Sequence, residues 1–218
     1  MWVKICANTN AEDALAAAEF GADAVGFVFA SSKRQVTAEQ VRAISAVMPN
    51  GVERIGVFGV GTVEEIAGAA TTARLTGVQL HGGVDLEFSR RLATRLGPAI
   101  SIIHTLHWTL GEDEESARGI ASHLQQLAPN ARLLVDTKTG GASGGTGKTF
   151  PWAKARELFA SRPEVQVIVA GGLGPENVAE AIRQLSPWGV DVASGVELVP
   201  GKKDMGKLKA FIENARRA

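Results

Sequence analysis

Two residues of the sequence could act together as a base and an acid. Cys6 ends the first apolar run of the chain, and Asp136 directly follows a later one. The ordinary pKa values of the two groups, about 8.5 and 3.9, lie on either side of neutrality. A thiolate can take up a proton, and a carboxylic acid whose pKa is raised by burial can give one. We therefore expect an acid–base pair; a small buried apolar role for Cys6 and a loop cap for Asp136 are the alternatives.

Two glycine-containing segments, each directly after an apolar run, could bind a phosphate. The sequence reads GGLGPEN at 171–177 and ASGV at 193–196. Glycine lets the backbone come close to an anion, and the start of a helix offers free N–H groups and the positive end of its dipole. Gly171, Gly172, Ser194 and Gly195 are therefore candidate phosphate-binding residues, with two tight turns as the alternative.

Arg34 and the histidines are further candidates. The planar guanidinium of Arg34 could hold a carboxylate or a phosphate, with a solvated loop arginine as the alternative. His81 follows the fourth apolar run and is expected to bind substrate. His104 and His107 follow the fifth run and could suggest a metal, but no carboxylate or cysteine completes an obvious ligand set. We therefore expect no metal site.

One segment resembles a P-loop without meeting its requirements. The sequence reads ASGGTGKT at 142–149, so that Ala142 stands where the first glycine belongs. The preceding apolar run ends several residues too early, and Pro151 would fall inside the helix that Lys148 and Thr149 should open. We expect instead a glycine-rich loop over the mouth of the site.

Length and composition exclude several classes of protein. The 218 residues, 45% of them hydrophobic, are enough for one sizeable core. Equal numbers of basic and acidic residues, 23 each, argue against a broad nucleic-acid or anionic-membrane surface but not against a local phosphate pocket. Cys6 is the single cysteine, which excludes an intrachain disulfide and a Cys-rich zinc site. Since we find neither a signal peptide nor a membrane span, we expect a soluble cytoplasmic protein without nucleic-acid or membrane partners.

The elements that position these residues follow from hydrophobic patterning. Short aliphatic runs predict eight strands, at 3–6, 24–29, 54–58, 77–80, 100–103, 132–135, 165–169 and 190–192. Most lack polar alternation, as expected for strands buried on both faces of a parallel sheet. Amphipathic segments between them predict eight helices, at 11–20, 37–48, 62–71, 84–96, 112–127, 151–159, 175–185 and 204–215. Pro151 and Pro175 suit the first turns of their helices.

Eight even strand–helix repeats favour a closed barrel over an open doubly wound sheet. We therefore predict a (β/α)8 TIM barrel formed by a single domain over residues 1–218. In such barrels the active site lies at the carboxyl ends of the strands, and a phosphate site recurs in the loops after strands seven and eight. The candidate residues follow the strand ends in just this way, which indicates a common site.

The residues also support a family resemblance. The sequence is similar to phosphoribosylanthranilate isomerases from its first strand to its last helix, in one order and register. The matching motifs are VKIC at 3–6, GADAVGFVF at 21–29, SKR at 32–34, VF at 57–58, VQLHG at 78–82, DT at 136–137, GGTG at 144–147, GGL at 171–173, VDVASGVE at 190–197 and PGKKD at 200–204.

The resemblance implies a step of tryptophan synthesis. Such an enzyme converts N-(5-phosphoribosyl)anthranilate to 1-(2-carboxyphenylamino)-1-deoxyribulose 5-phosphate by an Amadori rearrangement, without cofactor or metal. By the same resemblance, Asp136 is the general acid and Cys6 the general base, and Arg34 lies near the anthranilate end of the substrate. The loops at Gly171 and Ser194 match the phosphate-binding loops of the family.

The sequence departs from the family pattern at four places. The family usually has Gly-Ile-Thr or Gly-Leu-Thr after the cysteine, Lys-Ala in strand five, His-Gly-Glu after strand four and Phe-Asp-Trp after the strand-six loop. Here the corresponding residues are Ala7-Asn8-Thr9, His104-Thr105, His81-Gly82-Gly83 and Phe150-Pro151-Trp152. These changes leave open tuned kinetics, a shifted substrate preference or neutral drift.

Two other functions remain as alternatives. An isomerase of a histidine-pathway aminoaldose uses the same chemistry, but its expected pair of aspartates and its two-fold repeat are not found here. A silent barrel that only binds a phosphorylated metabolite is disfavoured because Cys6 and Asp136 are both present. The oligomeric state is left open.

Overall fold

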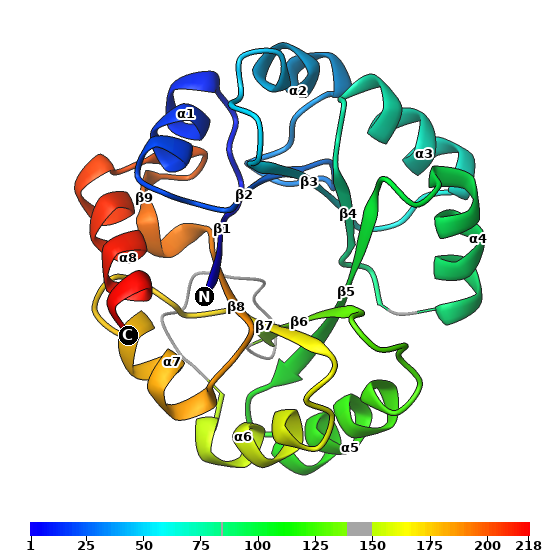
Figure 1. The fold of residues 1–218 in the computed structure, drawn as a ribbon, viewed down its shortest axis with the longest axis vertical. Coiled ribbons are helices and arrows are strands. Elements are labelled where there is room, and N and C mark those ends of the chain that lie inside the picture. The colour runs from blue at the N-terminus through cyan, green and yellow to red at the C-terminus, as the bar shows by residue number, and fades with distance from the viewer. Residues whose placement is uncertain (84, 139–149) are drawn as a thin grey trace.

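A computed structural model describes residues 1–83, 85–138 and 150–218 of the chain. Eight parallel strands close into a barrel in sequence order, and helices surround it (Figure 1). The strands are β1 Trp2–Ile5, β2 Ala24–Val28, β3 Glu53–Phe58, β4 Gly77–Leu80, β5 Ser101–Thr109, β6 Arg132–Lys138, β7 Gln166–Val169 and β8 Gly189–Val192. This arrangement confirms the predicted (β/α)8 TIM barrel.

The outer ring is formed by the helices α1 Ala11–Glu19, α2 Ala38–Ser45, α3 Val63–Thr72, α4 Leu86–Leu96, α5 Asp113–Leu124, α6 Trp152–Ala160, α7 Val178–Leu185 and α8 Met205–Arg217. Side chains cap several of them at their amino-terminal ends. Thr37 and Thr62 both form complete capping boxes at the starts of α2 and α3. Among the described residues, no helix is long and apolar enough to cross a membrane.

Apolar side chains pack in two layers. One large cluster fills the space between the barrel and its helices. A second cluster lies inside the barrel and contains Trp2, Ala24, Ile55, Ile103, Leu134, Ile168 and Ala170. All of these except Ala170, which follows the carboxyl end of β7, lie within the strands. Residues two positions further along the same strands point inward one layer higher, because side chains alternate along a strand. The inward-facing layer near the amino ends of the strands is therefore mainly apolar, and the next layer, toward the carboxyl ends, can carry polar side chains.

Strand β5 is longer than the sequence predicts. It continues to Thr109 and thus contains His104 and His107, which were placed after a strand ending at 103. The alternation along β5 sends Thr105 and His107 inward and turns His104 outward toward the helices. The two histidines, expected together at the mouth of the barrel, therefore lie on opposite faces of the strand.

Helix α7 begins later than predicted. Residues Pro175 and Asn177 lie in a turn, and the helix starts at Val178. The side chain of Asn177 accepts a hydrogen bond from the Gly174 N–H at 2.8 Å and donates one to the Gly172 carbonyl at 2.9 Å. These bonds hold the loop after β7 in a tight turn. Pro175 therefore lies before the helix, and the prediction that it belongs to the first turn is wrong.

A short hairpin between β8 and α8 is also missing from the prediction. The 3-10 turn Ser194–Val196 leads into β9 Glu197–Val199, which pairs antiparallel with β10 Lys202–Lys203. The hairpin returns the chain toward the end of β1 and brings Glu197 and Lys203 to the mouth of the barrel.

Candidate active site

A cavity of about 310 Å³ opens at the carboxyl ends of the strands. It is lined by every candidate acid–base, substrate and phosphate residue: Cys6, Arg34, His81, Asp136, Gly171, Gly172, Ser194 and Gly195. These residues come from six different strand ends and loops, and the closure of the barrel brings them together. The P-loop-like segment at 142–149 lies outside the described residues.

The floor of the cavity holds a polar network that sequence analysis missed. Lys4 is fully buried, and its ammonium donates hydrogen bonds to Gln79 and Asp191, both at 2.9 Å. Gln79 in turn donates to Thr105 at 3.2 Å. Burial acts to lower the pKa of Lys4, but Asp191 and Cys6 outweigh burial and hold that pKa above its ordinary value. The sequence did carry a signal, since Lys4, Gln79 and Asp191 each interrupt an otherwise apolar run.

Asp136 has the electrostatic environment of a proton donor. Burial raises its pKa to about 7, assisted by the negative charge of Asp191 and opposed by Lys4. At neutral pH a large share of these carboxyl groups therefore carries a proton, whereas an exposed aspartate would carry almost none. The expected raised pKa of Asp136 is thus present in the free protein.

Cys6 is buried but lines the cavity, with 7% of its surface exposed. Burial raises the pKa of its thiol, although the nearby Lys4 ammonium acts in the opposite direction and Asp191 adds to the rise. In the structure the thiol keeps its proton at neutral pH, and the thiolate is a minor species with high basicity.

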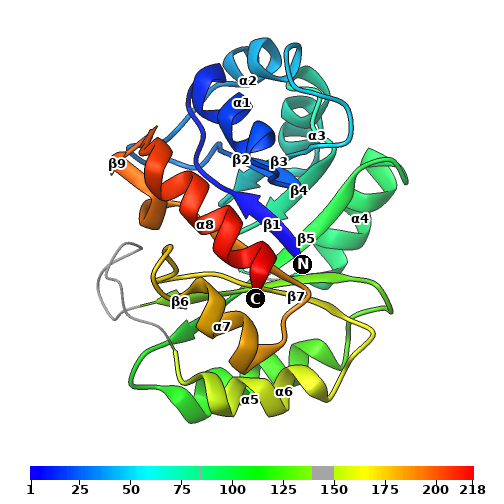
Figure 2. The same ribbon diagram turned by 60° about the vertical axis from the view of Figure 1, so that its left-hand side comes forward.

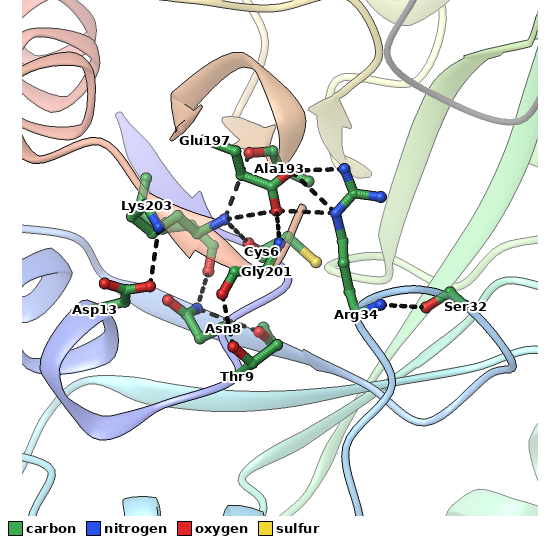
Figure 3. A network of polar contacts seen from close by, with 12 residues as sticks. Cys6, Asn8, Thr9, Asp13, Ser32, Arg34, Ala193, Glu197, Gly201 and Lys203 are labelled. Atoms are coloured by element: carbon green, nitrogen blue, oxygen red, sulfur yellow. Dashed lines mark hydrogen bonds and ion pairs between the residues drawn. The ribbon is translucent and has the colours of Figure 1, made fainter. Parts of the chain in front are cut away.

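Arg34 is held in place by an acidic partner from the hairpin (Figure 3). Its Nε donates to the Glu197 carboxylate at 2.8 Å and its Nη2 at 2.6 Å, which is a bidentate ion pair. Lys203 donates to the Cys6 carbonyl at 2.5 Å and lies 3.7 Å from Glu197. A single hairpin therefore fixes both the guanidinium of Arg34 and the backbone of Cys6. The guanidinium has five N–H groups, so its outer edge can still meet a ligand in the cavity.

Glycine is required in both candidate phosphate loops. Gly171 has a φ of +83°, and a Cβ there would lie 2.3 Å from the Thr137 nitrogen. A Cβ on Gly195 would lie 2.0 Å from the Leu173 carbonyl oxygen. The loops after β7 and β8 thus approach each other closely, and both backbones face the same cavity.

The four histidines of the chain form two separate pairs. The rings of His81 and His107 meet edge to face at the mouth of the barrel, with centroids 4.8 Å apart. His104 faces His123 of α5 at 5.7 Å on the outside of the barrel, where burial and the neighbouring His123 lower its pKa to about 4. In the register of β5 and β6, His107 stands directly opposite Asp136.

Comparison with known proteins identifies the family. The family model for N-(5'-phosphoribosyl)anthranilate (PRA) isomerase matches residues 3–214. The chain is 42% identical to N-(5'-phosphoribosyl)anthranilate isomerase of Thermotoga maritima over 218 residues, which cover 98% of each chain. It superposes on the crystal structure of the phosphoribosyl anthranilate isomerase of T. maritima with a TM-score of 0.88 and 40% identity, over 100% of both chains.

A second crystal structure shows such an enzyme with a bound ligand. It is a phosphoribosyl anthranilate isomerase in complex with reduced 1-(o-carboxyphenylamino)-1-deoxyribulose 5-phosphate, with a TM-score of 0.81, 38% identity and full coverage of both chains. Family model, sequence relatives and solved structures all extend from the first strand to the last helix. The chain therefore belongs to the N-(5'-phosphoribosyl)anthranilate isomerase family.

Proposed function

We propose that Cys6 is the general base and Asp136 the general acid with which this chain isomerises N-(5'-phosphoribosyl)anthranilate. Family membership assigns the activity, an intramolecular aldose–ketose rearrangement in tryptophan biosynthesis. The observation that carries the assignment of residues is the cavity, which holds a carboxyl group with a pKa of about 7 together with the single thiol of the chain.

The proposed reaction opens the furanose ring and then moves a hydrogen from C2 to C1. Asp136 protonates the furanose ring oxygen, the bond from that oxygen to C1 breaks, and the nitrogen lone pair forms a Schiff base with C1. Cys6 then removes the proton from C2, and the electrons of that C–H bond form a C1–C2 double bond as the Schiff base becomes an enolamine. Protonation of C1 and loss of the C2 hydroxyl proton give the ketone. A hydrogen has moved from C2 to C1, so the rearrangement balances without a co-reactant.

The buried charges support this division of roles. Asp136 is protonated in a large share of molecules at neutral pH, as a donor must be. The Lys4 ammonium stabilises the thiolate of Cys6, and the raised pKa makes that thiolate a strong base once it has formed. The productive form, with Asp136 protonated and Cys6 ionised, is therefore a minor but reactive one.

The two ends of the substrate are assigned to separate parts of the cavity. Gly171, Gly172, Ser194 and Gly195 hold the phosphate through backbone N–H groups, which need no surplus basic residues. Arg34 faces the anthranilate carboxylate with the guanidinium edge that Glu197 leaves open. The complex of a family member with a reduced product, which has both a phosphate and a carboxyphenyl group, supports a ligand of this shape.

The assignment is tested by turnover of N-(5'-phosphoribosyl)anthranilate, followed by its anthranilate-type fluorescence. Cys6→Ala is expected to lower kcat by about 10²–10⁴-fold, the contribution of a positioned base. His123→Ala on α5 is the matched control and should keep turnover, because its side chain lies outside the barrel. A Cys6→Ala enzyme that turns over near the wild-type rate contradicts the proposed role.

Neither alternative is favoured by a specific observation. The family model over residues 3–214 and the T. maritima relative are both phosphoribosylanthranilate isomerases, which favours that activity over isomerisation of a histidine-pathway aminoaldose. A barrel that only binds a metabolite would not need a carboxyl group with a pKa near neutrality in its cavity.

A further inference from the structure

Three ligand-type side chains meet at the mouth of the barrel although they are far apart in the sequence. His81 follows β4, His107 lies near the end of β5, and Asp136 lies near the end of β6. Parallel pairing places His107 opposite Asp136, and β4 lies on the other side of β5. Three consecutive strands therefore each contribute one side chain to the same part of the rim.

The three side chains are close enough to share one ion. One ligand atom from each lies within 4.8 Å of the others, and this is the one such group of three among the residues that the structure describes. Bonds of about 2.0–2.1 Å to a tetrahedral metal would separate the ligand atoms by about 3.4 Å. The side chains need to approach by up to about 1.4 Å, which requires small rotations about the side-chain torsions of the two histidines and the aspartate.

The donor set selects the class of ion. Two imidazoles and one carboxylate suit divalent transition metals, whereas magnesium and calcium prefer oxygen ligands alone. Three protein ligands leave a further coordination position open, as in mononuclear zinc sites with bound water. That position would face the cavity, which both His81 and Asp136 line.

We propose that His81, His107 and Asp136 form a binding site for a divalent transition metal such as Zn²⁺, and that its occupation inhibits the isomerase. The inhibition rests on the proposed function, because the ion takes the carboxylate of Asp136 away from the substrate. A carboxylate bound to a metal carries no proton, so it cannot protonate the furanose oxygen. The metal is thus an inhibitor of the reaction and takes no part in it.

The neighbouring histidine pair provides the matched control. His104 and His123 lie 5.7 Å apart on the outer side of β5, away from the cavity. Both pairs consist of two histidines on or beside the same strand, but only the inner pair has a carboxylate within reach among the described residues. Metal binding that is weakened by loss of His107 but not by loss of His123 therefore takes place at the inner pair, beside Asp136.

Binding is measured first, without substrate. Co²⁺ is titrated into the metal-free protein and followed by its visible absorption, which reports its coordination. Wild type and His123→Ala are expected to bind one equivalent. His107→Ala should bind at least about tenfold more weakly, since even groups outside the first coordination shell contribute about 10–100-fold to affinity. The proposed site is overturned if His107→Ala binds Co²⁺ as tightly as wild type, or if wild type binds no Co²⁺.

The same titration separates this site from the thiol. Cys6 is the single cysteine of the chain, so a thiolate-to-cobalt charge-transfer band could come from no other residue. Cobalt bound by His81, His107 and Asp136 would show no such band. Its appearance overturns the proposal, because the metal would then bind at Cys6.

Inhibition is measured second, with free Zn²⁺ fixed by a metal buffer. Wild type and His123→Ala are expected to lose turnover competitively with substrate. His107→Ala should keep its turnover, since His107 is not among the residues that line the cavity, and should need at least about tenfold more Zn²⁺ for the same inhibition. Equal sensitivity of His107→Ala and wild type overturns the proposal.

The two measurements also separate this inference from the proposed function. Loss of turnover in Asp136→Asn, without cobalt binding in wild type, overturns the metal site and leaves the general acid in place. Cobalt binding that depends on His107 and Asp136, while bound Zn²⁺ leaves turnover unchanged, overturns the inhibitory role and with it the role of Asp136 as the acid.

Discussion

The two ends of the barrel differ in how they accommodate charge. At the amino ends of the strands, Arg132 forms an ion pair with Glu53 at 2.6 Å, and Glu53 also accepts a hydrogen bond from the Trp2 indole at 2.9 Å. The guanidinium of Arg132 lies over the rings of both Trp2 and Trp188, 5.3 and 4.9 Å from their centroids. Arg132 and Glu53 thus each have partners of complementary chemistry.

At the carboxyl ends of the strands, burial disfavours the ionised forms of two side chains. Burial and the negative charge of Asp191 raise the pKa of Asp136, which has no ion-pair partner among the described residues. The thiolate of Cys6 is also disfavoured by burial. Ala7, the next residue, has a φ of +62°, a backbone conformation that favours glycine. One end therefore contributes stability, and the other gives up stability for reactivity.

The largest expected effect is at Asp136. The unfolded carboxyl releases its proton near pH 3.8 and the folded one near pH 7, so the folded protein loses stability as pH rises through this window. Asp136→Asn removes the buried charge and should raise the free energy of unfolding at pH 8 by about 2–4 kcal/mol. The same change should lower kcat by about 10²–10⁴-fold. Urea unfolding and turnover measure the two effects.

The pH profile of kcat/KM gives a second measurement on the same variant. In wild type it should rise with pH as Cys6 ionises and level off near pH 7, where loss of the Asp136 proton offsets that gain. In Asp136→Asn the residual activity should continue to rise beyond pH 7. Glu64→Gln, a neutralised carboxylate on the exposed face of α3, is the control and should change stability by about 0.5 kcal/mol or less. A less stable Asp136→Asn protein contradicts the comparison between the two ends.

A smaller effect of opposite sign is expected at Arg132. Arg132→Met removes a partly exposed ion pair and two cation–π contacts, which together contribute about 1–2 kcal/mol. The free energy of unfolding should fall by that amount while kcat and KM stay unchanged, because Arg132 is at the end of the barrel away from the cavity. Arg42→Met on the exposed face of α2 is the control. Altered turnover in Arg132→Met would show that the two ends are not independent.

The smallest effect is at Ala7. Ala7→Gly relieves a left-handed conformation that costs alanine about 1–2 kcal/mol, and part of this gain is offset because glycine is more flexible in the unfolded chain. The net rise in unfolding free energy should be about 0.5–1 kcal/mol, measured by urea denaturation. Ala14→Gly in the middle of α1 has the opposite expectation, a loss of about 1–2 kcal/mol, because it adds flexibility and removes a buried methyl group. A destabilised Ala7→Gly protein would show that the methyl group has a packing role that outweighs the strain.

The sequence predicted the barrel because both of its signals are local. Buried parallel strands such as 165–169 are continuous aliphatic runs, and the amphipathic segments between the strands mark the helices. The ends of the strands then pointed to Cys6 and Asp136. What could not be predicted depends on register: no periodicity indicates that His107 stands opposite Asp136 or that Lys4 reaches Gln79 across the barrel.

The missed hairpin has a similar cause. Strand β10 contains only Lys202 and Lys203, which is too short for any alternation to be visible. Its importance lies in contacts with residues far away in the sequence, such as the bond from Lys203 to the Cys6 carbonyl. The departure at Ala7 was visible in the sequence, but its cost became apparent only with its backbone angle.

Both chain ends lie at the amino ends of the strands (Figure 2). The last turn of α8 is fastened there, because Arg216 donates hydrogen bonds to the carbonyl groups of Met1 and Gly21 and pairs with Asp23 at 2.7 Å. A tag or a surface attached through either terminus would therefore meet the molecule opposite its cavity. Immobilised copies would keep their cavities accessible to the surrounding solution. The two neighbouring termini could also be joined by a linker, with new termini created in a loop elsewhere, to give a circular permutant.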